Sequence, residues 1–131
     1  MNNRGPGRAF GPIKGVIVPI SLDCETCFGI KILRVQGALG EFEGLELIAQ
    51  VNELLQGIGD SLVIDINDVP SINSAGIGSI VRIQAQANTQ EQIVLFAGPT
   101  PIVRGVFSAT RLDKFLRIYP SREDALQAIK Q

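Results

Sequence analysis

The stretch that decides the fold runs from residue 62 to residue 80 and reads Leu62-Val-Ile-Asp-Ile-Asn-Asp-Val-Pro-Ser-Ile-Asn-Ser-Ala-Gly-Ile-Gly-Ser-Ile80. It begins with an apolar run, Leu62 to Ile66, whose length and β-branched content are typical of a buried strand. Asn67 and Asp68 are polar, and Pro70 cannot donate a hydrogen bond to a central ladder. We therefore expect a core strand that ends at this turn.

A helix is expected to follow, over about residues 75–90. Asn73 or Ser74 can cap it, because a side-chain oxygen there accepts a first-turn N–H that otherwise has no partner. Gly76 and Gly78 lie inside the first turn, although glycine costs a helix about 1 kcal/mol relative to alanine. The two glycines predict the close approach of another surface, and the positive end of the helix makes a hydroxyl there a site for contact or phosphate.

Outside this stretch, hydrophobic periodicity and turn residues predict the remaining elements. Strands are expected over residues 16–22, 28–36, 93–97 and 115–119, and helices over 41–58, 101–107 and from 122 onward. Helices that alternate with strands in this way are typical of parallel strand connections. The sequence thus predicts an α/β domain whose mixed, mostly parallel β-sheet has about five strands, with about four helices.

The helical spacing also predicts which side chains face the core. In the first helix, these are Leu47, Ile48, Val51, Leu54, Leu55 and Ile58. In the central helix, Ile77, Ile80, Val81 and Ala87 are expected to face inward, and Ser79, Arg82, Gln86 and Gln90 to form an outer polar stripe. That stripe begins beside Ser74, so it is either ordinary solvated surface or the footprint of a partner.

The first 15 residues carry four glycines, two prolines and no acidic residue. Such a stretch cannot offset the entropy of ordering by burying surface, so we expect a flexible tail over 1–15 and one domain over 16–131. No charged-then-apolar leader is recognisable, and the apolar runs are far shorter than the roughly 20 residues that cross a bilayer. These features predict a cytoplasmic protein without a membrane span.

Charge is distributed unevenly along the chain. The net charge is −1, so no overall excess of positive charge favours nucleic acid as a partner. Residues 23–68 hold nine acids against two bases, whereas residues 82–131 hold seven bases against four acids. The asymmetry indicates either two differently charged solvated faces or a dipolar surface that orients a charged protein partner.

Catalytic chemistry has little support in the composition. The chain contains no histidine, which removes the usual general base and the commonest zinc ligand. Cys24 and Cys27 form a Cys-x-x-Cys pair, but no second pair completes a four-ligand metal site. We place the pair in a hairpin turn, with incidental or structural thiols favoured over a redox motif. The sequence predicts no enzyme activity, no metal and no cofactor.

The residues from Asp68 to Gly78 resemble the signature loop of STAS domains, the fold of bacterial anti-sigma factor antagonists. In that family an apolar strand leads through an acidic turn into a segment of the type Asp-Ser-Ser/Thr-Gly-Leu-Gly, whose first serine is phosphorylated by an anti-sigma kinase. Ser74 holds that position, and Asp68 lies in the acidic turn. The resemblance extends from about residue 16 to the C-terminus. Its later part is Pro101-Ile102-Val103, Phe107 and Leu112-Asp113-Lys114-Phe115.

This resemblance implies a non-enzymatic regulator that sequesters an anti-sigma kinase and so frees a sigma factor, with Ser74 as the switch. The implied partner-binding residues are Asn73, Ser74, Ala75, Gly76, Ile77, Gly78, Ser79, Arg82 and Gln86. Gly40 and Asn73 stand where the family has aspartates. The alternative is therefore a STAS subunit that is not phosphorylated and belongs to a larger assembly, such as a stressosome-type scaffold or a lipid-transport accessory. A nucleotide- or anion-binding module ranks last, because no Gly-x-x-x-x-Gly-Lys loop is present. A homodimer is left open.

Overall fold

A computed structural model describes residues 20–130 of the chain. The elements are β1 (Ser21–Cys27), β2 (Ile30–Gln36), α1 (Glu41–Leu54), β3 (Ser61–Asp68), α2 (Ser74–Thr89), β4 (Ile93–Ala97), α3 (Pro101–Ala109), the short 3-10 helix η1 (Leu112–Lys114), β5 (Ile118–Tyr119) and α4 (Arg122–Lys130). The tail predicted over residues 1–15, and the part of the first predicted strand before residue 20, lie outside the described residues.

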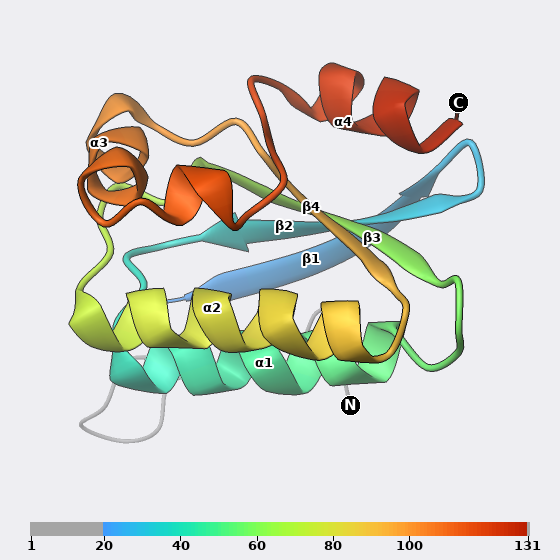
Figure 1. The fold of residues 1–131 in the computed structure, drawn as a ribbon, viewed down its shortest axis with the longest axis horizontal. Coiled ribbons are helices and arrows are strands. Elements are labelled where there is room, and N and C mark those ends of the chain that lie inside the picture. The colour runs from blue at the N-terminus through green and yellow to red at the C-terminus, as the bar shows by residue number, and fades with distance from the viewer. Residues whose placement is uncertain (1–19, 131) are drawn as a thin grey trace.

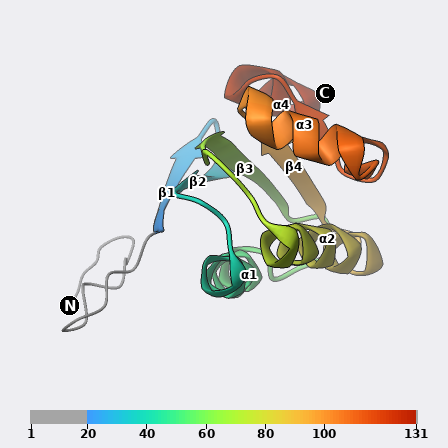
Figure 2. The same ribbon diagram turned by 90° about the vertical axis from the view of Figure 1, so that its left-hand side faces the viewer.

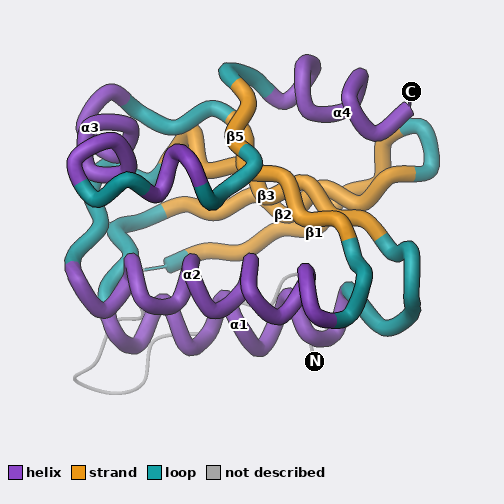
Figure 3. Tube along the Cα trace, in the orientation of Figure 1, coloured by secondary structure: helices purple, strands orange, loops and turns teal. Residues whose placement is uncertain are grey.

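The strands form one five-stranded sheet in the order β1-β2-β3-β4-β5. β1 pairs with β2 in an antiparallel hairpin, and the other neighbouring strands are parallel. The predicted mixed, mostly parallel sheet with four α-helices is confirmed. The parallel order places the carboxyl ends of β2 and β3 at the same edge, where the loops lead into α1 and α2, as Figure 3 shows.

Helices cover both faces of the sheet (Figure 1). α1 and α2 lie side by side on one face, and α4 lies on the other, as the turned view of Figure 2 shows. Most of the core lies between the sheet and the pair α1/α2, and Val103 and Phe107 of α3 also pack into it. A smaller cluster on the opposite face joins Ile32 and Val63 to Leu126 of α4. Each central strand therefore buries both of its faces, which explains its nearly continuous apolar run.

The observed start of the sheet differs from the prediction. The first strand extends to Cys27, and the hairpin turn is Phe28-Gly29, where both residues have positive φ. Cys24 and Cys27 therefore lie on β1 and not in a turn. Because neighbouring side chains on a strand alternate between faces, residues three apart point to opposite sides of the sheet.

Two other elements are shorter than predicted. The first helix ends at Leu54, where Lys31 Nζ donates to the Leu54 carbonyl at 3.1 Å. Asp60 then accepts the backbone N–H of Gln56 and Gly57, which bends the chain away from helix geometry. Ile58 consequently lies outside the helix and is exposed, not part of the core. The last strand contains only Ile118 and Tyr119, because the residues before it form η1 and a turn.

Candidate functional site

The candidate site is built from the two loops that leave β2 and β3. The backbone N–H of Leu39 donates to the Ser71 carbonyl at 3.0 Å, and the N–H of Asn73 donates to the Leu39 carbonyl at 3.1 Å. Leu39 and Ile72 also form an isolated parallel bridge. These bonds extend the β2/β3 pairing beyond the ends of the strands. The residues before α1 and those before α2 are thus held as one rigid surface.

Asn73 caps α2. Its backbone is extended, with φ −103°, and its Oδ1 accepts the backbone N–H of Gly76 at 2.9 Å. Of the two predicted caps, Asn73 is the one observed. Ser74 is instead the first helical residue, its side chain is exposed, and its hydroxyl has no hydrogen-bond partner within residues 20–130. The Ser74 hydroxyl is therefore exposed and without an internal hydrogen bond at the positive end of α2.

The two glycines near the start of α2, Gly76 in its first turn and Gly78 in its second, have different surroundings. A Cβ at Gly76 would lie 2.9 Å from both the Leu39 carbonyl carbon and Ile72 Cγ1, so the neighbouring loop of the same chain needs the space. Nothing lies within 4 Å of a Cβ at Gly78. The predicted close approach is thus internal at Gly76, whereas Gly78 leaves an open surface next to Ser74.

Gly40 and Asn73, the two positions where the resembling family has aspartates, are neighbours in space. A Cβ at Gly40 would lie 3.3 Å from Asn73 Nδ2 and 2.9 Å from Glu43 Oε1. Glu43 reaches back to accept the N–H of Gly40 at 3.1 Å, at the start of α1. The two uncharged residues therefore adjoin each other next to Ser74, and the Glu43 carboxylate lies beside them.

Only some of the residues of the predicted partner footprint on α2 are exposed. Ala75, Gly78 and Arg82 are exposed along the helix from Ser74. Ser79, expected on the outer stripe, is buried: a Cβ on Gly44 of α1 would lie 2.7 Å from the Ser79 Cβ. This contact between small residues lets the two helices approach closely.

Other positions of α2 differ from the prediction in how deeply they are buried. Gln86 is half-buried, and Gln90 is exposed just beyond the helix. Ile80 and Ala87 face the core as expected, whereas Ile77 and Val81 are only half-buried and Ile83 and Gln84 are buried in their place. The inward face is therefore turned relative to the predicted one, toward the side that meets α1.

A groove of about 220 Å³ lies between α1 and α2 beside this surface. Ala75, Gly78 and Arg82 line it from α2, and Glu41 and Leu45 line it from α1. Leu45 and Phe42 are 53% and 78% exposed, unusual for large apolar side chains. The α1 side of the groove was not predicted from the sequence. The available signal was that Phe42 and Leu45 fall outside the inward stripe of their helix.

An ion-pair cluster on the opposite face of the sheet was also missed. Arg122, the first residue of α4, donates to Asp65 Oδ2 from Nε at 3.2 Å and from Nη2 at 2.9 Å, and it also pairs with Glu25 of β1. Asp65 Oδ1 accepts the N–H of Asn67. Burial lowers the pKa of Arg122, but the hydrogen bonds with Asp65 and Glu25 outweigh it and raise that pKa. The cluster joins α4 to two strands, so its role is structural.

Cys24, Cys27 and Asp68 are the remaining sequence candidates. Cys24 and Cys27 are free thiols, and burial raises the pKa of Cys24. Within residues 20–130, no group of three or more Cys, Asp or Glu side chains is arranged to hold a metal ion. Asp68 ends β3 and accepts a 3.4 Å hydrogen bond from Gln36. None of the helices in the described part of the chain is long and apolar enough to cross a membrane.

Comparisons with known proteins bear on this geometry. The family model of the STAS domain matches residues 21–125. A curated protein of Thermotoga neapolitana is 28% identical over 79 residues, which span 60% of this chain and 70% of that protein, and its name provisionally assigns it as an anti-sigma factor antagonist.

Solved structures share the fold. A Thermotoga maritima protein, provisionally described in the same terms, superimposes with a TM-score of 0.72 at 22% identity, over 84% of this chain and 95% of that one. The phosphorylated form of the Bacillus cell fate determinant SpoIIAA gives 0.61 at 16% identity, over 82% and 98%. The murine anion transporter Slc26a9 gives 0.67 at 16% identity, over 78% of this chain and 18% of that one. At these identities the likeness is one of fold.

Proposed function

The chain belongs to the STAS domain family, and from this premise we propose that it is an anti-sigma factor antagonist switched by phosphorylation of Ser74. In this proposal the unmodified protein binds and sequesters an anti-sigma kinase in the cytoplasm, which frees a sigma factor. It catalyses no reaction itself. The name of the T. neapolitana relative provisionally assigns it as an anti-sigma factor antagonist, and the SpoIIAA fold relative occurs in a phosphorylated form.

The observation that carries the proposal is the free hydroxyl of Ser74. It is exposed at the first position of α2, and Asn73, not Ser74, provides the cap. A serine with no internal hydrogen bond at this position is available to a kinase. Ala75 and Gly78, which follow it, leave space for a flat protein surface.

Phosphorylation would act on the complex more than on the fold. A phosphoserine carries about −1.5 to −2 charges near neutral pH, and the positive end of α2 stabilises negative charge. The exposed position of Ser74 means that the phosphate requires no rearrangement of the core. In an interface built on this surface, however, the same charge and bulk would have to be desolvated, which weakens binding.

One observation favours a second candidate function. Gly40 and Asn73 form an uncharged pair beside Ser74, so a kinase that recognises carboxylates at those positions would find none. A STAS subunit of a larger assembly would use the same helix face as a fixed contact, without phosphorylation. The occurrence of the fold within a larger transporter is consistent with this use.

The test compares Ser74→Ala and Ser74→Asp, each immobilised and used to capture partners from lysate of the source cells. Because Asn73 keeps the cap in both variants, their melting temperatures should lie within a few degrees of each other. Ser71 is the matched control site for phosphorylation, since it is exposed on the same loop but precedes the helix. If Ser74 is a switch, Ser74→Ala retains the partner kinase, whereas Ser74→Asp lowers affinity tenfold or more, about 1.4 kcal/mol.

Phosphate analysis completes the experiment. Incubation of the wild-type protein with the captured kinase and ATP should place phosphate on Ser74 and not on Ser71, as read by mass spectrometry of the peptides. Equal affinities of the two Ser74 variants for the same partner, with no phosphate on Ser74, would contradict the switch. That result would favour the fixed-contact function.

A further inference from the structure

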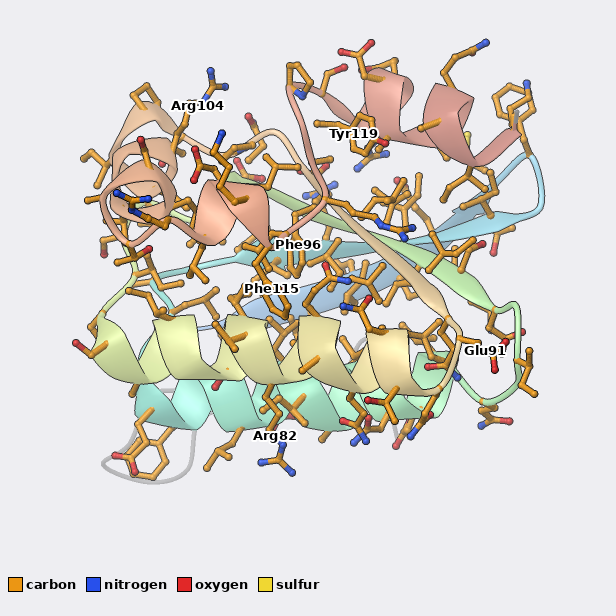
Figure 4. All side chains as sticks on the ribbon, in the orientation of Figure 1. Arg82, Glu91, Phe96, Arg104, Phe115 and Tyr119 are labelled. Carbon is orange, nitrogen blue, oxygen red and sulfur yellow. The ribbon has the colours of Figure 1, made fainter. Side chains whose placement is uncertain are left out.

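A second cleft, of about 610 Å³, shares no lining residue with the candidate site. Its walls are α3 on one side and the chain from η1 through β5 to Pro120 on the other. In Figure 4 the labelled lining residues Arg104 and Tyr119 lie on one side of the molecule, and Arg82 of the α1/α2 groove lies on the other. The proposed antagonist function does not use this cleft.

The deep part of the cleft is apolar. Phe107 of α3 and Leu116 line it and are 1% and 5% exposed, and Ile118 of β5 is half-buried beside them. Phe107 and Leu116 belong to the main core, so packing fixes their positions. Phe107 and Leu116 thus form a packed floor, the accessible apolar lining comes from Ile118, Tyr119 and Pro120, and the volume falls within the roughly 300–1,000 Å³ of small-molecule sites.

Unpaired polar groups line the same cleft. Arg104 and Arg117 are exposed, and neither makes an ion pair with any residue between 20 and 130. The hydroxyls of Ser108 and Tyr119 also have no hydrogen-bond partner in that part of the chain. Asp113 is the single acid among the lining residues, so the lining keeps a positive charge.

We propose that this cleft binds a small organic anion, a phosphate or carboxylate carried on an aromatic or aliphatic body. The two guanidinium groups present planar donor pairs that match phosphate and carboxylate oxygens, and the two hydroxyls add donors. The body of the ligand packs on Ile118, Tyr119 and Pro120. The concave shape and apolar depth favour a small molecule over a membrane or an acidic protein, because those partners contact convex or flat surfaces.

Phenyl phosphate is the probe, because it has both parts of the proposed ligand. We would titrate it into the full-length protein and follow the backbone amide resonances by NMR, with inorganic phosphate and phenol as the two half-ligands. The expected result is saturable shifts confined to α3 and residues 112–120, with phenyl phosphate binding at least about tenfold tighter than either half-ligand. The variant Arg104→Gln/Arg117→Gln should lose this binding by at least about tenfold, since charge-assisted hydrogen bonds are lost.

The matched control is Arg82→Gln, an exposed arginine on the opposite side of the molecule, which should bind phenyl phosphate like the wild-type protein. Because both arginines are exposed, the double variant should keep the wild-type amide spectrum outside the cleft. Equal binding by wild-type and double variant, shifts centred on Ser74, no saturable binding, or affinity for inorganic phosphate equal to that for phenyl phosphate would each overturn the proposal. Co-sedimentation of the protein with anionic lipid vesicles, together with a failure to bind phenyl phosphate, would also overturn the proposal. That result would assign the two arginines to contact with a membrane surface.

Discussion

Replacing Gly76 and Gly78 separately by alanine measures how tightly the loop before α1 is packed on the start of α2. Both glycines lie within the first two turns of the same helix, so an added methyl group brings a similar favourable change in helix propensity, roughly 0.5–1 kcal/mol. At Gly78 nothing lies within 4 Å of the new methyl. Gly78→Ala is therefore expected to stabilise the protein slightly.

At Gly76 the same methyl would lie 2.9 Å from the Leu39 carbonyl carbon and from Ile72 Cγ1. Most of the obstruction is backbone, which cannot rotate away, and such overpacking costs about 1–3 kcal/mol. Moving the Leu39 carbonyl also strains its hydrogen bond from Asn73 N–H, worth about 0.5–1.5 kcal/mol. After the propensity gain, we expect Gly76→Ala to lower the free energy of unfolding by about 2 kcal/mol.

Urea denaturation of the two variants and the wild-type protein, followed by far-ultraviolet circular dichroism, gives the comparison. The denaturation midpoint should fall for Gly76→Ala and stay equal or rise for Gly78→Ala, with similar slopes. Hydrogen exchange should speed up at the Leu39 and Asn73 amides in Gly76→Ala alone. A Gly76→Ala variant as stable as Gly78→Ala would refute the reasoning, because the two loops would then not be in firm contact.

Two further predictions concern charged groups. Arg122→Met should lower the free energy of unfolding by about 1.5–3 kcal/mol, because it leaves the buried Asp65 carboxylate with only the Asn67 N–H. Thermal or urea denaturation would measure this loss of stability, and a loss no larger than that of Arg82→Met would contradict the prediction. The Gly57 and Gln56 N–H groups lower the pKa of Asp60 from its ordinary value of 3.8. The Asp60 carboxylate thus stabilises the fold above that value and loses this effect as pH falls through its lower folded pKa. Stability should fall less steeply with acid in Asp60→Asn, and parallel stability–pH curves of the two proteins would be evidence against it.

The sequence by itself determined the type and order of most elements. The apolar runs of β3 and β4 predicted buried strands, because strands buried on both faces carry apolar residues at nearly every position. The helix starts expected at 101 and 122 agree with the structure, where Thr100 caps α3 and Ser121 caps α4, since caps act within one turn of chain. Ser74 was also recognisable as a candidate site residue, because its motif is continuous in sequence, but whether Asn73 or Ser74 caps α2 was decided only by the structure.

Features that join distant segments were decided only by the tertiary structure. The contact of Gly40 with Asn73 depends on the pairing of β2 with β3, and the burial of Ser79 depends on Gly44 of another helix. Asp65 lies within the apolar run of β3, and only the folded chain places Arg122, 57 positions later, against its carboxylate. Local periodicity shows which side of an element is apolar. The partner that covers that side is fixed by the packing of the whole chain, so the α1 side of the groove and the cleft beside α3 appear only in the folded molecule.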